Sequence, residues 1–268
     1  MRARAQDGVN EHGGGALKLA SFLFSHPLSS IHPSNFRSPL TCERSLLPRA
    51  DGSARWTAGG TSALAAVYGP SSTSARVEDP ERAVVRASWR AAPVVGTAGP
   101  PVATPAARAL EAILAGMVRA ALLAEAAPRT AISIDVTIEA DDGGAAAAGL
   151  NAAAAALADA GGCLPLRALP AAGSVVVAGD GTLLADPTAA EEADCSGTAT
   201  FAFLTRSSAP GSPPALVGGG GLAGASVSGA LSDDQVLGAT ALAGGAARAA
   251  AGFNRAGLAR CFGWEAGG

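Results

Sequence analysis

The chain has 268 residues, a formal net charge of −3, 15% charged residues and 49% hydrophobic residues, and about a quarter of it is alanine. Intrinsic disorder requires low hydrophobicity and high net charge, so this composition excludes disorder for most of the chain. No histidine follows His32 and Lys18 is the single lysine, which excludes histidine relays, histidine-ligated zinc sites and catalytic lysines from the rest of the chain.

Residues 1–38 differ from the rest because they hold all three histidines and a short apolar patch over residues 17–24. Asp7 and Glu11 weaken a signal-peptide interpretation of this segment. We predict a mobile N-terminal extension over residues 1–38 and a folded domain over residues 39–264. No apolar run reaches the roughly 18 to 20 residues of a membrane span, so no membrane partner is expected.

The first half of the domain, residues 39–162, is divided by turn residues and by hydrophobic periodicity. Thr104 and Pro105 suit the cap and the first position of a helix. Strict alternation over residues 132–138 predicts a half-buried strand. In chain order we expect a strand or hairpin over residues 54–68, a strand over 81–91, a loop over 94–101, a helix from 104 to about 122, the strand 132–138, a turn over 141–144 and a helix over 145–160.

The second half, residues 163–264, repeats the sequence of strands followed by a helix. Asp180 and Gly181 form a turn signal between two apolar runs, which predicts a β-hairpin. Ser232 and Gln235 match a helix capping box. In chain order we expect a hairpin over residues 173–185, a strand over 198–204, a loop over 207–214, a short strand over 215–217 and a long alanine-rich helix from 232 to about 262.

These elements predict an α+β fold in which two similar halves, each with strands followed by a helix, share one hydrophobic core.

Three glycines, Gly219, Gly221 and Gly224, fit the GxGxxG pattern of dinucleotide-binding loops. That pattern requires a βαβ unit and an acidic residue about 20 positions further on. The acids here, Asp233 and Asp234, come too early and lie in the capping box. A flexible hairpin loop is therefore preferred to a nucleotide site.

An acidic cluster follows the predicted hairpin and comprises Asp186, Glu191, Glu192 and Asp194. Close carboxylates can hold Mg²⁺ or perform acid–base chemistry. The alternative is a solvated turn between strands. Arginines in the first half could pair with phosphate, although solvated surface charge is the more common meaning of such residues.

The order of several motifs resembles that of the ribonuclease PH family. The matching segments cover nearly all of the chain from about residue 40 to 262. They are residues 42–54, 59–61 and 67–70 near the start, 128–130 before the central strand, 150–152 and 156–161 in the central helix, and 180–188 with Glu191 and Glu192 in the late hairpin.

The resemblance implies a ribosomal protein S5 domain 2-like fold and a place among the ring subunits of the RNA exosome. The partners it implies are other ribonuclease PH-like ring subunits, RNA-binding cap subunits, and RNA in the channel of the ring. It also implies a role in 3′–5′ RNA processing and degradation, including ribosomal RNA maturation, in the nucleus and nucleolus and also in the cytoplasm.

Active members of the family bind phosphate with a Gly-Thr-Arg run and use downstream aspartates near a metal. Here Gly143 and Gly144 are followed by Ala145 and Ala146 in place of Thr and Arg. Glu192 and Thr198 stand where the two catalytic aspartates would be, and Ala112 and Ala115 where helix arginines are common. The resemblance therefore implies a subunit without catalytic residues, cofactor or bound metal, since phosphoryl chemistry relies on positioning and electrostatics.

Two functions follow from these observations. The first is a non-catalytic structural subunit of the exosome core ring, with Arg108 and Arg119 as candidate RNA contacts. The alternative is a residual metal-dependent or phosphorolytic 3′–5′ exoribonuclease that acts alone or as a homodimer and uses the acidic cluster.

Overall fold

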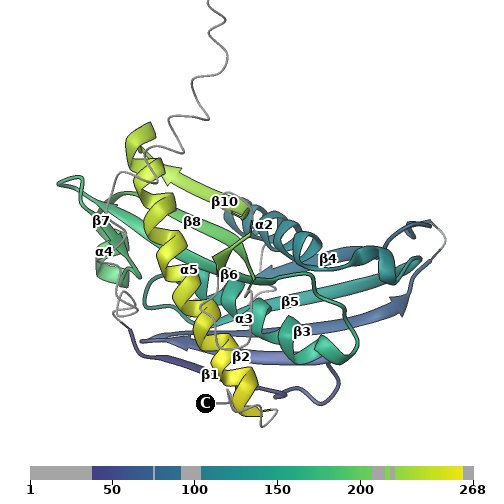
Figure 1. Cartoon of the computed structure of the whole chain (residues 1–268). Coiled ribbons are helices and arrows are strands. Elements are labelled where there is room, and N and C mark those ends of the chain that lie inside the picture. The colour runs from purple at the N-terminus through teal and green to yellow at the C-terminus, as the bar shows by residue number, and fades with distance from the viewer. Residues whose placement is uncertain (1–37, 75, 92–103, 207–214, 218–220, 262–268) are drawn as a thin grey trace, which may run out of the picture. The chain divides into compact units, whose positions relative to one another are not determined.

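The structure is a computed structural model that describes residues 38–74, 76–91, 104–206, 215–217 and 221–261. The predicted extension up to residue 37, the loop over 94–101 and the loop over 207–214 lie outside these ranges. Two five-stranded sheets and three long helices make up the described part (Figure 1). The predicted α+β class is confirmed.

The first sheet is built from the N-terminal half of the domain. Its strands lie in the order β1-β2-β3-β5-β4, and all neighbours are antiparallel except β4 and β5, which are parallel. The helix α2 connects this parallel pair, as a crossover between parallel strands requires. The elements are β1 (Leu40–Arg44), β2 (Gly52–Ala58), β3 (Thr61–Ser72), β4 (Val84–Arg90), α2 (Pro105–Ala121), a 3₁₀ turn (Ala124–Ala126) and β5 (Thr130–Ala140).

The second sheet is built from the C-terminal half and is antiparallel throughout. Its strands lie in the order β10-β8-β6-β7, with β9 paired to β8. The helix α5 lies across β6 and β8 (Figure 1). The elements are β6 (Leu169–Ala178), β7 (Leu183–Ala185), α4 (Ala189–Ala193), β8 (Cys195–Arg206), β9 (Ala215–Leu216), β10 (Leu222–Gly229) and α5 (Asp233–Cys261).

The helix α3 (Ala145–Asp159) lies between the two sheets and explains much of the alanine content; the 3₁₀ turn Ala160–Gly162 ends it. It packs against β2 and β3 of the first sheet and β6 of the second, so every residue from Ala147 to Leu157 is buried. A helix covered on both sides is apolar all round rather than amphipathic. Small side chains let the sheets approach closely, most of all at Gly149, where the ring of Trp89 occupies the space that a Cβ atom would need.

Most of the predicted elements are confirmed, including the Thr104 cap of α2 and the reciprocal hydrogen bonds between Ser232 and Gln235 before α5. Three elements were not expected. The strands β1 and β10 lie at sheet edges, and the short helix α4 stands where a solvated turn was the simpler expectation. The β10 segment is rich in glycine, alanine and serine, so its strand structure comes from pairing with β8 rather than from β propensity.

The expectation that no segment is long and apolar enough for a membrane span needs correction at α5. By length and composition alone this helix qualifies, with a mean hydropathy of 1.2 over its most apolar window. Its buried residues are mainly alanine and glycine, which pack on β6 and β8. The same composition is typical of a core helix, and this packing accounts for it.

Candidate functional site

The turn that precedes α3 occupies the place predicted for the family's phosphate site. Gly143 has a φ of 103° and Gly144 a φ of 65°, a backbone conformation that favours glycine. A side chain at Gly143 would also collide with the backbone of Pro187 and Thr188. Thr61 secures the turn, because its Oγ1 donates to the Gly143 carbonyl (2.7 Å) and accepts from the Asp142 N–H (2.8 Å). The predicted Gly-Gly turn is therefore confirmed as a tightly packed backbone feature.

The first turn of α3 presents backbone N–H groups that would attract an anion. The anion present is the chain's own Glu192, whose Oε1 accepts a hydrogen bond from the Gly144 N–H at 2.9 Å. Burial raises the pKa of Glu192, the negative charge of Asp141 adds to this effect, and the Gly144 N–H opposes it. Glu192 therefore acts as an internal partner of this helix end.

A short helix holds Glu192 in place. α4 begins after Thr188, which forms a capping box with Glu191: the Glu191 N–H donates to Thr188 Oγ1 at 3.4 Å, and the Thr188 N–H donates to Glu191 Oε2 at 2.9 Å. The Ala189 N–H also donates to the Asp142 carbonyl at 2.8 Å, which joins α4 to the turn before α3.

Asp186 lies on the other side of the same region. It has a φ of 55°, its Oδ2 accepts from the Ser38 N–H at 3.0 Å, and its own N–H donates to the Ser174 carbonyl at 3.2 Å. The Asp186 carboxylate therefore ties the start of the described chain to the edge of the second sheet.

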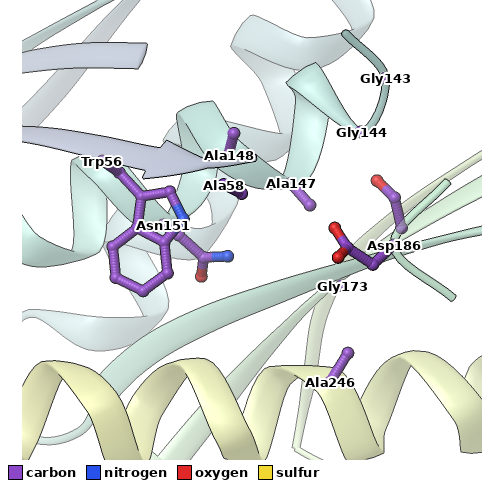
Figure 2. Close-up of a pocket in the computed structure, with 11 residues that line it drawn as sticks. Trp56, Ala58, Gly143, Gly144, Ala147, Ala148, Asn151, Gly173, Asp186 and Ala246 are labelled. Atoms are coloured by element: carbon purple, nitrogen blue, oxygen red, sulfur yellow. The ribbon is translucent and has the colours of Figure 1, made fainter. Parts of the chain in front are cut away.

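The space enclosed by these elements is very small. Figure 2 shows Asp186 and the Gly143–Gly144 turn facing a pocket between β2, α3, β6 and α5. Its cavity volume is about 10 Å³, about what one water molecule needs. The lining residues are Trp56, Ala58, Gly143, Gly144, Ala147, Ala148, Asn151, Gly173, Ser174, Asp186 and Ala246, none of which is cationic. The pocket has neither the volume nor the charge for a phosphate ion.

The structure places the predicted degenerate residues in three locations. Ala145 and Ala146 are the first two residues of α3, beside the Gly144 cap, and each offers only a methyl group. Glu192 is brought to the same turn. Thr198 lies in β8, paired with Val176 on one side and Ser228 on the other. That these are the family's lost catalytic positions stays a prediction.

The acidic cluster does not act as one group. Asp186, Glu191 and Glu192 accept hydrogen bonds from Ser38, Thr188 and Gly144 respectively. Among the residues that the structure describes, no three His, Cys, Asp or Glu side chains are placed to hold a metal ion. The arrangement gives the magnesium hypothesis no geometric support.

The remaining candidates are resolved as follows. Arg108 and Arg119 are exposed on α2, and Arg119 Nε donates to the Ala115 carbonyl at 3.0 Å. Their role as RNA contacts stays a prediction.

Gly224 lies within β10 and Gly221 directly before it, and β10 is antiparallel to β8. A dinucleotide loop leads from a strand directly into a helix, so these two glycines do not form one. The expected flexible hairpin loop needs correction as well, because Gly224 pairs with Ala202 of β8 and the Gly221 carbonyl accepts from the Leu204 N–H at 2.7 Å. Gly219 lies outside the described residues.

Sequence reasoning missed Asn151, a buried polar residue in the middle of α3. Its Nδ2 donates to the Ala172 carbonyl at 3.0 Å, and its Oδ1 accepts from the Ala172 N–H at 2.8 Å. The signal was available, because an amide within an alanine-rich buried helix requires a hydrogen-bonding partner.

Comparisons with known proteins agree with this geometry. Residues 36–162 match the sequence model of the 3′ exoribonuclease family, domain 1, also called RNase PH. A relative named exosome complex exonuclease RRP46 homolog, from Arabidopsis thaliana, is 34% identical over 172 residues, which is 64% of this chain and 66% of the relative. Its counterpart from Oryza sativa is also 34% identical over 172 residues, 64% of this chain and 68% of the relative. The chain thus spans about two thirds of the length of these relatives.

Solved structures give the same answer. The crystal structure of rice Rrp46 superposes with a TM-score of 0.68 at 28% sequence identity, covering 82% of this chain and 95% of the rice chain. A chain of the Archaeoglobus fulgidus exosome with RNA bound to the active site gives a TM-score of 0.64 at 18% identity, covering 92% of this chain and 97% of that one, and supports the fold. From its fold, its motif order and its relatives, the chain belongs to the RNase PH family of 3′ exoribonucleases.

Proposed function

We propose that the chain is a structural subunit of the RNA exosome core ring and that it has no phosphorolytic activity of its own. Its partners are other RNase PH-like ring subunits and RNA-binding cap subunits, and RNA passes through the channel that the assembly forms. The names of the plant and archaeal relatives support the ring assignment. The role is to support 3′–5′ RNA processing and degradation, including ribosomal RNA maturation.

The observation that carries the loss of activity is the position of Glu192. Its carboxylate accepts a hydrogen bond from the Gly144 N–H at the N-terminus of α3. In a phosphate-binding enzyme of this family, the substrate phosphate would have to occupy this position. The adjacent Ala145 and Ala146 supply no hydroxyl or guanidinium group. A second anion here would be repelled by Glu192 and would find no cationic side chain in the pocket.

The names of the plant relatives favour a second candidate, a residual exoribonuclease, because both are called exonucleases. The carboxylates available to it in this chain are Asp186 and Glu192, which accept hydrogen bonds from Ser38 and Gly144. Such an enzyme would release nucleoside monophosphates in a metal-dependent reaction, or nucleoside diphosphates when phosphate is the attacking group.

Purification of a tagged full-length chain from its native cells tests the ring assignment. We expect the other RNase PH-like ring subunits and the cap subunits to co-purify in near-equal amounts, with the tag in the nucleus, the nucleolus and the cytoplasm. A stable monomer or homodimer without ring subunits contradicts the proposal.

A further inference from the structure

A second pocket lies where β6 begins and β8 ends. Its volume is about 220 Å³, and its walls are residues 166–169, Thr205, Arg206 and Arg255. Ala246 lines the small pocket beside α3, whereas Arg255 lies nine residues further along α5. At 1.5 Å per residue the two pockets are about 14 Å apart along the helix. The second pocket is therefore separate from the degenerate site.

Three of its seven lining residues are arginines, and none is acidic. Arg167 Nη2 contacts Glu125 at 3.3 Å, and this carboxylate is the one anionic partner recorded for the three guanidinium groups within the described residues. Arg206 Nη2 donates to the Arg167 carbonyl at 3.2 Å, and Arg255 Nη2 donates to the Thr205 carbonyl at 3.2 Å. The group therefore carries uncompensated positive charge.

Arg255 shows that this charge is partly withdrawn from water. Its Nε is buried and has no hydrogen-bond partner, and burial lowers the pKa of the Arg255 side chain. A buried donor without a partner and a half-buried cation without a counter-ion are both unfavourable. An anion in the pocket would supply the missing counter-ion and so offset the second of these costs.

We propose that Arg167, Arg206 and Arg255 form a binding site for a phosphoryl group. Guanidinium groups match phosphate oxygens through paired N–H donors, and a tetrahedral oxyanion can receive donors from several directions at once. A single planar carboxylate is fully matched by one arginine, so three arginines that line one pocket favour phosphate. The phosphoryl group is either a backbone phosphodiester of single-stranded RNA or a free phosphate or nucleotide. The site stands independently of the ring assignment, since it rests on these side chains alone.

The test uses the full-length chain and a variant that neutralises the two exposed arginines, Arg167→Gln with Arg206→Gln. The matched control is Arg82→Gln with Arg86→Gln, which removes the same charge from exposed positions near and on β4 in the first sheet. Binding of a fluorescently labelled single-stranded RNA of about 12 nucleotides is followed by anisotropy over a range of salt concentrations. We expect a loss of affinity of about tenfold for the pocket variant and less than about twofold for the control. The slope of log K against log salt should fall by about 1.4, or about 0.7 per lost arginine.

A second measurement distinguishes the two sources of phosphate. Inorganic phosphate and adenosine diphosphate are added at millimolar concentration, with thermal stabilisation as the readout. If phosphate or adenosine diphosphate stabilises the wild type but not the pocket variant, the site binds free phosphoryl ligands. If the pocket variant loses only RNA affinity and neither small ligand stabilises the wild type, the site binds the RNA backbone. Arg255→Lys keeps the charge but removes the paired donors, and should weaken either ligand by at least threefold.

Either of two results overturns the proposal. In the first, the pocket variant matches the wild type in both measurements. In the second, the pocket variant binds an acidic peptide such as oligoglutamate more weakly than the wild type does, while its affinities for RNA and phosphate are unchanged. That result would assign the arginines to a protein partner. Neither result affects co-purification with ring subunits, so failure of this site is distinguishable from failure of the proposed function.

Discussion

The carboxylate of Glu192, in α4, accepts a hydrogen bond from the backbone N–H of Gly144, the residue that caps α3. This contact joins two segments 48 residues apart in the chain. The partial positive charge at the N-terminus of α3 favours the negative charge of the Glu192 carboxylate. Half-burial of the carboxylate and the nearby charge of Asp141 disfavour it. The contact therefore makes stability depend on pH in a predictable direction.

Replacing Glu192 with Gln should stabilise the protein more at pH 7.5 than at pH 4. Burial raises the pKa of Glu192 above its ordinary value of 4.5, so the folded state holds the proton more tightly than the unfolded state does. This difference stabilises the folded protein fully at a pH below the pKa that Glu192 has in the unfolded state. The stabilisation is lost as the pH rises through the higher pKa that Glu192 has in the folded state. The Gln variant retains an acceptor for Gly144 but cannot ionise. Urea unfolding of both proteins at the two pH values measures the effect. If the difference in free energy of unfolding between the variant and the wild type is the same at pH 4 and pH 7.5, Glu192 does not titrate in this way.

Asn151→Ala should lower the free energy of unfolding by about 2 to 6 kcal/mol. The substitution removes both hydrogen bonds to Ala172 and leaves a backbone N–H and a carbonyl unsatisfied in the core, at a cost of about 1 to 3 kcal/mol for each buried group. Chemical denaturation provides the measurement. Ser62→Ala, which removes a surface hydrogen bond to Glu139, is the control and should cost less than about 0.5 kcal/mol. Similar losses for the two variants would contradict the role given to Asn151.

Two glycines within helices should respond in opposite directions to alanine. At Gly149 a Cβ atom would collide with the buried ring of Trp89, so Gly149→Ala should destabilise the protein by about 1 to 3 kcal/mol. At Gly116, in α2, the nearest atom to a new Cβ is the Ala223 carbonyl oxygen at 3.6 Å, an ordinary contact. Gly116→Ala should therefore stabilise the protein by about 0.5 to 1 kcal/mol through helix propensity. Thermal unfolding compares the two variants, and a stable Gly149→Ala protein would refute the close packing of α3 against β4.

Ser232→Ala should cost about 1 kcal/mol, because it removes the acceptor for the Gln235 N–H at the start of α5. Gln235→Ala removes the reciprocal bond to the Ser232 N–H. The double variant should lose less than the sum of the two single losses, since each half of the box helps to position the other. Denaturant midpoints of the three variants test this, and full additivity would mean that the two bonds act independently.

The parts of the fold that could be predicted from sequence are those with a local signal. The alternation over residues 132–138, the Thr104 cap and the Ser232–Gln235 box depend on residues close in the chain, and the structure confirms all three. The edge strands β1 and β10 carry no comparable signal. β10 contains two alanines, two glycines and two serines besides Leu222 and Val227, and β8 determines its conformation through pairing.

The site was predictable only in part for the same reason. Ala145 and Ala146 could be identified because they directly follow two glycines that the family resemblance places at the phosphate site. The contact of Glu192 with Gly144 could not, because it depends on how α4 packs against a turn 48 residues earlier. The cluster of Arg167, Arg206 and Arg255 likewise arises only when the segment before β6, the end of β8 and the helix α5 meet.

Incubation of the purified full-length chain with labelled single-stranded RNA, with and without inorganic phosphate, tests the loss of catalysis most directly. With Glu192 at the Gly144 N–H and alanine at positions 145 and 146, we predict that no nucleoside diphosphate is released under either condition. Phosphate-dependent release of nucleoside diphosphates would contradict the account.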